Sequence, residues 1–209
     1  LHDNIMLLDI GAGNTDIGVF EGTTFLYTNS IPLGGDNITN DIALVLNISE
    51  EEADKLKRQY GLALKSFIDN DNDIILNTCK DNNKNKIIKS SELIEIIEAR
   101  IEEMFSIINK DITNQGLKQK INNVVLTGQG IVNINKSDVA GKINLNIPVK
   151  ISTGRAISTV KPIYRTSYAL VRYIAARPFA KTVSSSIDTQ NNESFMKNIW
   201  ERIKEFFYS

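Results

Sequence analysis

Residues 7–20 read LLDIGAGNTDIGVF, and the expected fold follows from this stretch. An apolar, strand-like run ends at a lone carboxylate, Asp9, and two glycines at alternate positions, Gly11 and Gly13, precede a second strand-like run that begins at Thr15. Two strands joined by a Gly-rich turn form a hairpin. Glycines permit positive φ angles and remove side chains that would block a ligand. Successive N–H groups in such a turn form a concavity that binds anions.

The hairpin turn therefore predicts a phosphate site of the two-strand kind. A carboxylate at its edge, Asp9, can hold a hydrated Mg²⁺. A Walker loop is excluded here because no Gly-Lys-Ser/Thr follows the glycines. An ordinary tight hairpin has the same local pattern, since short glycine motifs are common.

The composition limits the classes of protein to consider. The 209 residues suffice for one large domain or two small ones, and a net charge of −1 gives no support for nucleic-acid binding through a basic field. A single cysteine, Cys79, excludes an internal disulfide and is typical of a reducing cytoplasmic setting. The single histidine, His2, argues against His-based triads and most zinc sites. No apolar run reaches the roughly 18 residues of a membrane-spanning helix.

Periodicity predicts the elements that follow the hairpin. We expect a third strand over 24–31 and then a turn in which Asp36 is the N-cap of a helix through Leu46. A second helix is expected from Ser49, with Glu52 completing a capping box and Gly61 at the C′ position.

Residues 62–117 differ in composition and are predicted to form an inserted α+β subdomain. Two short apolar runs, 74–76 and 87–88, predict a small sheet, and Ser90 or Ser91 is expected to cap a long helix. The apolar face of that helix is expected to be Leu93, Ile97, Ile101, Met104, Phe105 and Ile108, and Gly116 follows its end.

A second Gly-rich turn follows a buried strand. Residues 124–126 predict this strand, which ends at Gly128, Gln129 and Gly130. A further strand is expected at 148–151 and an amphipathic helix over 164–176, before a polar, Ser/Asn-rich linker at 181–194.

The last residues, 195–208, predict an amphipathic helix rich in Trp and Phe. A terminal helix of this kind, beyond a polar linker, fits an interfacial membrane helix. It also fits a helix that docks in a partner's groove, or one that packs on the domain itself. Its apolar side consists of Phe195, Met196, Ile199, Trp200, Ile203, Phe206 and Phe207.

The order of these motifs resembles the second lobe of the actin/Hsp70 ATPase fold, an α/β architecture with a mixed sheet flanked by helices. Within it, the chain resembles the FtsA family of bacterial cell-division proteins. The resemblance rests on LDIG with Gly13 and Thr15, on IPLGGD at 31–36, on the helix with Tyr60-Gly61, and on VLTG with Gly130. The stretch 93–105 and a terminal amphipathic helix fit the same family.

The resemblance implies a division into parts. Residues 1–61 and 118–163 would be the nucleotide-binding subdomain (2A type), 62–117 the inserted subdomain (2B type), and 164–180 a helix crossing toward a missing lobe. Residues 181–194 would be the linker and 195–208 the membrane-targeting helix. Since the chain begins at Leu1, directly before a strand, we expect an N-terminal part of the protein to precede it.

The resemblance also implies roles for single residues toward ATP and Mg²⁺. Asp9 would orient metal-bound water, as the residue closest to catalysis. The β- and γ-phosphates would meet Gly11, Gly13, Asn14 and Thr15, and the sugar-phosphate side would meet Gly34, Gly35 and Asp36. Asp54 and Lys57 would lie beside ribose and adenine, although an i, i+3 pair is also an ordinary surface contact. Gly128, Gln129 and Gly130 would form the adenosine turn.

Three residues depart from the family pattern. Ala12 and Gln129 replace the middle glycines of the two turns, and Asn14 replaces a threonine. A Gln side chain at 129 would hydrogen-bond the base or crowd it. The family's first half, with its own phosphate hairpin, is not present in these residues, so we expect these residues alone to bind nucleotide weakly or not at all.

The function implied by the resemblance is that of a membrane adaptor. ATP would favour self-association into actin-like filaments, the tail would bind an anionic membrane surface, and the inserted subdomain would bind the C-terminal peptide of FtsZ. Arg100 would contact that peptide, or it is an ordinary exposed helix arginine. The protein would be peripheral, at the cytoplasmic face of the cell membrane at the division site, and at most a weak ATPase.

The alternative is a soluble ATPase, kinase or chaperone-type protein whose terminal helix docks on a partner. A rod-shape or pilus-type relative is a third possibility, although rod-shape relatives usually carry such a helix at the N-terminus.

Overall fold

The computed structural model describes residues 4–76, 86–152 and 165–175. The chain divides into two compact units, Leu1–Thr153 and Gly154–Ser209, and each is described by itself. Within the second unit the described residues form one helix, α5, at Arg165–Ala175. The sequence predicted a helix over 164–176, so this element is confirmed. The predicted linker and the terminal helix at 195–208 lie outside the described residues.

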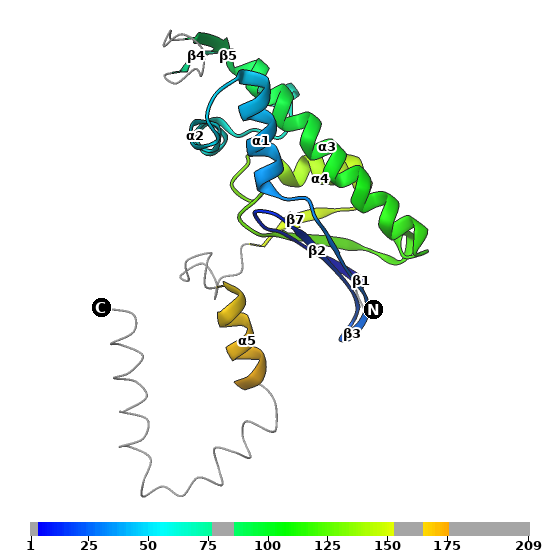
Figure 1. Ribbon diagram of the computed structural model, residues 1–209. Helices are drawn as coiled ribbons and strands as arrows, with labels where there is room; N and C mark the ends of the chain where they lie inside the picture. The colour runs from blue at the N-terminus through cyan, green and yellow to red at the C-terminus, as the bar shows by residue number, and fades with distance from the viewer. Residues whose placement is uncertain (1–3, 77–85, 153–164, 176–209) are drawn as a thin grey trace, which may run out of the picture. The chain divides into compact units, whose positions relative to one another are not determined.

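A five-stranded mixed sheet organises the first unit (Figure 1). Its strands are β1 (Asn4–Ile10), β2 (Thr15–Glu21), β3 (Thr24–Ile31), β6 (Asn123–Thr127) and β7 (Val149–Ile151). They lie in the order β3-β2-β1-β6-β7. β1 pairs with β2 and β2 with β3 in antiparallel fashion, whereas β1–β6 and β6–β7 are parallel. The predicted hairpin, third strand and later strands are thus confirmed.

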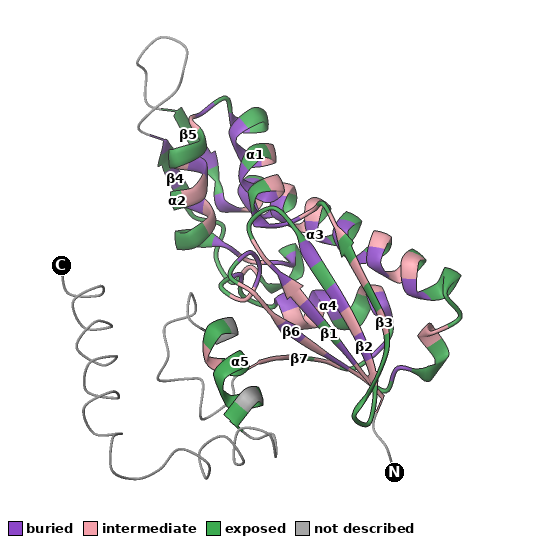
Figure 2. Cartoon of the chain, turned by 60° about the horizontal axis from the view of Figure 1, so that its bottom comes forward, coloured by how far each residue is buried: buried purple, intermediate pink, exposed green. Residues whose placement is uncertain are grey.

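The helices of the first unit pack on one another, and α4 also packs against β7 of the sheet. They are α1 (Gly35–Leu46), α2 (Glu50–Tyr60), α3 (Ser90–Asn114) and α4 (Ser137–Leu145), and Figure 1 shows α3 and α4 on the same side of the strands. Alternate residues of β1, among them Met6, Leu8 and Ile10, are fully buried under the helices. Figure 2 shows this buried layer in purple between strands and helices. The mixed sheet therefore buries one face under helices, as predicted for the fold class.

The predicted inserted segment contains a two-stranded antiparallel sheet and the long helix α3. Its strands are β4 (Asp73–Leu76) and β5 (Lys86–Lys89), and a short 3₁₀ turn, η1, lies at Lys65–Phe67. The predicted apolar face of α3 is confirmed, because all six residues from Leu93 to Ile108 named above are at most 1% exposed. A second 3₁₀ turn, η2 (Lys118–Lys120), leads into β6.

Two helix starts differ from the prediction. The N-cap of α1 is Gly34, whose N–H donates to the Asn37 side chain at 2.8 Å, and Asp36 lies inside the first turn. The N-cap of α3 is Lys89, and the Ser91 backbone N–H donates to Asp71 at 2.9 Å. A carboxylate nineteen or twenty residues away thus does the capping that local serines were expected to do.

Two further findings concern the end of α2 and a helix that the sequence did not predict. Gly61 ends α2 with φ −59°, outside the left-handed region; a Cβ there would lie 2.3 Å from the Lys57 carbonyl oxygen. The sequence did not predict α4, because Gly141 in its middle and Asn144 near its end lower helix propensity. Packing explains this glycine: a Cβ at Gly141 would lie 3.0 Å from the Phe105 ring. Among the described residues, none forms a helix long and apolar enough to cross a membrane.

Candidate functional site

Three turns meet at the ends of β1 and β6. We call them the turn cluster: residues 9–14 at the end of β1, 33–36 at the start of α1, and 127–130 at the end of β6. Backbone hydrogen bonds join them directly. The N–H of Gly35 donates to Gly11 O at 2.9 Å, that of Asp36 to Ala12 O at 2.8 Å, and that of Gly130 to Ile10 O at 2.9 Å. Segments more than a hundred residues apart in sequence are thereby fixed against one another.

Four glycines make this close approach possible. A Cβ would lie 2.0 Å from Gly11 O at Gly130, 2.2 Å from Ile10 O at Gly128, and 2.3 Å from Ala12 O at Gly34. At Gly35 it would lie 2.7 Å from the Gly130 Cα. Side chains at these positions would therefore push the turns apart. These glycines allow the backbones of the turns to pack together, whereas the sequence analysis had assigned glycines in these turns to the approach of a ligand.

Gly11 and Gly13 do not need the conformational freedom expected of them. Among the described glycines only Gly22, Gly116 and Gly128 have positive φ. A Cβ at Gly13 would meet nothing within 4 Å, and one at Gly11 would make an ordinary 3.4 Å contact with Asn14 O. The hairpin turn is thus open at Gly13, and its geometry does not itself demand glycine there.

Thr15 ties the hairpin to the second turn. Its buried hydroxyl donates to the Leu33 carbonyl oxygen at 2.7 Å. Asn14, which precedes it, is exposed, and its carbonyl oxygen accepts the Gly11 N–H at 2.8 Å. Both residues were predicted to contact phosphates, and the structure places them in the frame of the turn cluster.

Asp9 lies at the end of β1, opposite Asp16 on β2. Burial, and then the charge of Asp16, raise the pKa of Asp9 above its ordinary value. A Cβ at Gly128 would lie 2.5 Å from Asp9 Oδ1, so the carboxylate lies beside the third turn. A carboxylate that is costly to ionise is a group that a cation would stabilise.

Lys57 joins α2 to the start of α1. Its ammonium group donates to Gly35 O at 3.0 Å and to the Thr39 hydroxyl at 2.6 Å, and lies 3.0 Å from Asp54 Oδ1. These contacts account for all three N–H donors of an ammonium group. The side chain is only 11% exposed. Lys57 therefore holds the turn at Gly35 in place.

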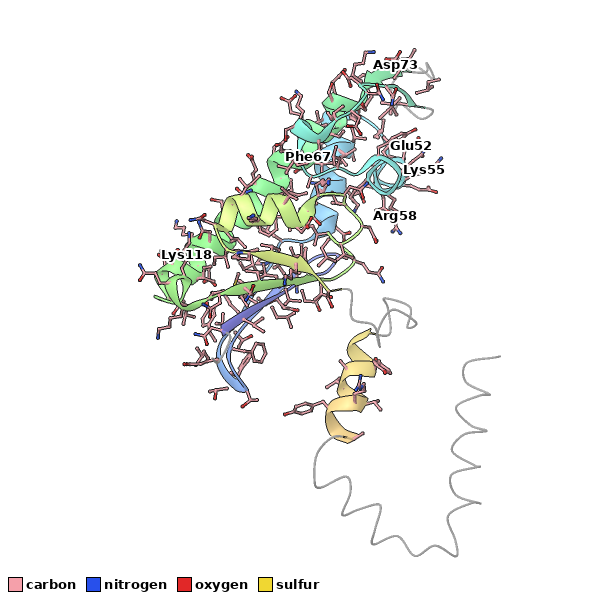
Figure 3. The ribbon with its side chains drawn as sticks, turned by 180° about the vertical axis from the view of Figure 1, so that it is seen from behind. Glu52, Lys55, Arg58, Phe67, Asp73 and Lys118 are labelled. Carbon is pink, nitrogen blue, oxygen red and sulfur yellow. The ribbon has the colours of Figure 1, made fainter. Side chains whose placement is uncertain are left out.

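Asp54 is shared between two cations. Its second oxygen accepts from Arg58 Nε at 2.7 Å. Burial alone would raise the pKa of Asp54, but hydrogen bonds from Arg58 and Lys57, and their charges, hold it below its ordinary value. Arg58 and Lys55 are both well exposed on α2, where Figure 3 labels them.

A cavity of about 110 Å³ lies between the turn cluster, α2 and residues 133–134. Six of the residues around it were predicted as site residues: Gly35, Asp36, Asp54, Lys57, Gln129 and Gly130. Sequence reasoning did not assign the other four, Ala12, Arg58, Asn133 and Ile134. Arg58 follows Asp54 at i+4, a spacing that could have indicated it. Nothing local indicates Asn133.

The remaining predicted residues frame the cavity or lie elsewhere. Gly13 borders a second, polar hollow together with Asp36 and Asp54. Arg100, on α3, is bound within the chain: its guanidinium group contacts both oxygens of Asp41 on α1, and also Glu103. Its predicted contact with a partner peptide stays a prediction.

This architecture, a three-strand meander joined to parallel strands with glycine turns at one edge, is that of an actin-like ATPase fold. The structure of MreB5 of Spiroplasma citri bound to AMPPNP superimposes with a TM-score of 0.65 at 16% identity, over 90% of this chain and 56% of that one. The ethanolamine utilization protein EutJ from Carboxydothermus hydrogenoformans gives a TM-score of 0.53 at 20% identity, over 77% and 48% of the two chains. At these identities the likeness concerns the fold alone.

Sequence comparison is more specific. A family model described as "Cell division protein FtsA" matches residues 6–199, and the chain belongs to this family. The FtsA protein of Bacillus subtilis is 32% identical over 169 residues, covering 81% of this chain and 38% of that protein. That of Buchnera aphidicola is 32% identical over 205 residues, covering 92% and 48%. The chain thus spans about half the length, or less, of these relatives.

Proposed function

We propose that this chain forms the second, nucleotide-binding half of an actin-like cell-division protein, with ATP and Mg²⁺ bound at the turn cluster. The observation that carries the proposal is the convergence of both glycine turns and the start of α1 on one cavity, with Asp9 beside the turn after β6. The fold of the MreB5 structures, solved with ADP and AMPPNP, supports it.

The residues present suit a magnesium nucleotide. Asp9 would hold Mg²⁺ through water, and the raised pKa of its carboxyl group means that a cation would relieve an unfavourable charge. The phosphates would lie along the turns at Gly11–Thr15 and Gly34–Asp36, where the dipole of α1 favours anions although the N–H groups of Gly35 and Asp36 are bonded to the hairpin turn. The nucleoside would lie between Asp54 on α2 and the turn at Gly128–Gly130. Mg²⁺ would neutralise the phosphates beside Asp36.

Binding assays with the purified chain test this proposal. We expect isothermal titration calorimetry to detect binding of Mg-ATP. We expect Asp9→Asn to reduce the effect of Mg²⁺ on the affinity for ATP about ten-fold or more. Without ligand the same variant should unfold at a higher temperature, because a carboxylate with a raised pKa destabilises the folded state at neutral pH. Asp69→Asn, on an exposed loop residue, is the control. A chain that binds no Mg-ATP would contradict the proposal that this half holds the nucleotide by itself.

The domain division predicted from the sequence is part of the proposal. Residues 1–61 and 118–163 would carry the nucleotide, 62–117 would bind a partner, 164–180 would connect to another lobe, and 181–194 would be the tether to the helix at 195–208. Bound ATP would favour self-association into filaments. Filaments would multiply the modest membrane affinity of each terminal helix through avidity.

We propose that the terminal helix binds the cytoplasmic face of the cell membrane at the division site. Replacing Trp200 and Phe206 by Glu places charge on its apolar side, and should abolish sedimentation with anionic liposomes. The matched control adds the same charge in the linker, by Gln190→Glu and Asn191→Glu, and should sediment as the unaltered chain does. Equal sedimentation of the two variants would refute the membrane role.

The proposed partner of the inserted segment is the C-terminal peptide of FtsZ. Arg100 is the proposed contact, and a carboxylate of the peptide would have to join or replace Asp41 at its guanidinium group. Arg100→Ala should weaken binding of a labelled peptide in fluorescence anisotropy. Asp41→Asn, which frees the same guanidinium group, should strengthen it. If both variants bind as the unaltered chain does, Arg100 is not a contact.

A further inference from the structure

β3 is an outer strand of the five-stranded sheet, and one of its edges is free. In the part of the chain that the structure describes, β3 pairs with β2 only. The Ser30 N–H donates to the Asn29 side chain at 2.9 Å, a bond within the strand and not one to β2. Backbone groups of alternate residues point to opposite sides of a strand, so those of Thr28 and Ser30 face the free edge. Both residues are exposed.

This edge lacks the residues that usually prevent strand pairing. Residues 24–31 read TFLYTNSI, with no charged residue and no proline. Threonine, tyrosine and isoleucine favour extended backbone. The register with β2 shifts between Val19 and Phe20, and such a bulge twists the strand locally. The regular stretch with an open edge is therefore 27–31.

The inner side of this stretch is fixed to α3. The Tyr27 hydroxyl donates to both carboxylate oxygens of Asp111, at 3.0 Å each. The Asn29 side chain donates to the same carboxylate at 3.2 Å. β3 is thus held in extended form from one side, while its outer backbone groups stay available. A strand that is already ordered loses little conformational entropy when it pairs.

We propose that β3 pairs in antiparallel fashion with β3 of a second copy of this chain, over residues 27–31. Thr28 of each copy would lie opposite Ser30 of the other, and each such pair would exchange two backbone hydrogen bonds. The Ser30 N–H would give up its bond to Asn29 for this. Opposed threonine and serine side chains stabilise a ladder. A second copy suits this edge, because two uncharged strands related by a twofold axis place no like charges opposite one another.

This contact is distinct from the filament contact of the proposed function. A twofold pair is closed, whereas a filament needs a head-to-tail contact that repeats. The groups of the β3 edge are backbone groups that require no nucleotide. Pairing can therefore be measured without ATP, and its failure would leave the proposed function untouched.

Sedimentation equilibrium of the full chain without nucleotide tests the inference. Pairing of one strand buries less area than a standard interface, so we expect a weak dimer with a Kd of about 10–100 µM. Thr28→Lys with Ser30→Lys places positive charges opposite one another and should raise the Kd about ten-fold or more.

A matched variant reverses only one of these charges. Thr28→Glu with Ser30→Lys places opposite charges across each pair and should keep the Kd within about three-fold of the unaltered value. The lysine at position 30 suits the fold in both variants, because Asp16 lies beside it and now accepts from the Ser30 hydroxyl at 2.6 Å. Gln59→Lys with Gln119→Lys adds two charges at exposed residues outside β3, and should leave the Kd unchanged.

Each contrary outcome overturns the inference. A chain that stays monomeric at about 200 µM would mean that any occupant of this edge is a different protein. A dimer that the two lysines do not weaken uses another surface. Equal loss in both double variants would exclude the pairing of Thr28 with Ser30. A dimer that disappears with Trp200→Glu and Phe206→Glu forms through the terminal helix. Circular dichroism spectra verify that each variant is folded.

Discussion

The turn cluster and the outer part of the inserted segment are held together by different groups. In the turn cluster, backbone N–H and carbonyl groups bond directly across three turns, and glycines leave no room for side chains. In the outer segment, which comprises residues 62–76 and 86–100, side chains make the links. Asp71 caps α3, Lys65 contacts Glu95 at 2.6 Å, and Arg100 binds Asp41.

This difference has consequences for tolerance to mutation. Backbone contacts at van der Waals distance cannot relax around an added side chain, because interiors are close-packed. Exposed ion pairs and caps contribute little singly, and they depend on salt and pH. We therefore expect steep and local effects in the turn cluster, and graded effects that depend on conditions in the outer segment.

The largest expected effect comes from Gly130→Ala. The new Cβ would lie 2.0 Å from Gly11 O, so two turns must separate and their hydrogen bonds weaken. We expect the free energy of unfolding to fall by about 2–4 kcal/mol in urea denaturation. Gly13→Ala is the matched control, since a Cβ there meets nothing within 4 Å, and should change stability by about 0.5 kcal/mol at most. Equal effects at both positions would show that the turns do not interlock as described.

Lys57→Met should have the next largest effect. It removes three contacts and leaves Gly35 O and the buried Thr39 hydroxyl without this donor. We therefore expect the free energy of unfolding to fall by about 2 kcal/mol. Lys55→Met is the control, because Lys55 is 66% exposed and lies 3.8 Å from Glu52. It should cost about 0.5 kcal/mol at most. If ATP affinity falls while stability is unchanged, Lys57 contacts the ligand and does not hold α1.

The sequence predicted the turn cluster better than the contacts that link it to α2. Glycines, a strand-ending carboxylate and alternating apolar residues are local signals, so the strands, α1 and both turns could be placed from them. Lys57 is different, because its partners Gly35 and Thr39 lie 22 and 18 residues away and only the packing of α2 on α1 brings them together.

Most other failures have the same cause. Asp71 caps α3 across a loop, and Asn37 displaces Asp36 as the partner of the first turn of α1. The helix α4 forms despite Gly141. The residue is a glycine because Phe105 of α3 occupies the space that a side chain would need. Asn133 borders the cavity only through the turn after β6. The Asn37 contact is local, but the cap at Asp71 and the glycine in α4 depend on tertiary contacts that override local preference.

A smaller effect is expected for the pair Arg100 and Asp41, which joins α3 to α1. Its side chains are 23% and 22% exposed, so solvent screens them only in part. A double-mutant cycle with Arg100→Met and Asp41→Asn should give a coupling energy of about 1 kcal/mol, and less in 1 M salt. Arg58 and Asp54 are the comparison: Arg58 is 70% exposed, and the coupling should be about 0.5 kcal/mol. A coupling that salt does not reduce would contradict a link made by charge.

The smallest expected effect is the pH dependence of the cap at Asp71. The Ser91 backbone N–H lowers the pKa of Asp71 from its ordinary value of 3.8, although desolvation opposes this. The hydroxyls of Ser91 and Ser90 and the charge of Lys89 lower the pKa further. The unfolded chain therefore binds this proton more readily than the folded chain does. The stabilisation is complete above the ordinary pKa, and is lost as pH falls through the lowered value of the folded state. Asp71→Asn should thus lower the melting temperature at pH 7, and the difference from the unaltered chain should shrink below about pH 4. Asp69→Asn, at an exposed loop residue, is the control. A difference that stays constant with pH would mean that the cap acts through shape and not through its charge, and the outer segment would then resemble the turn cluster more closely than its contacts indicate.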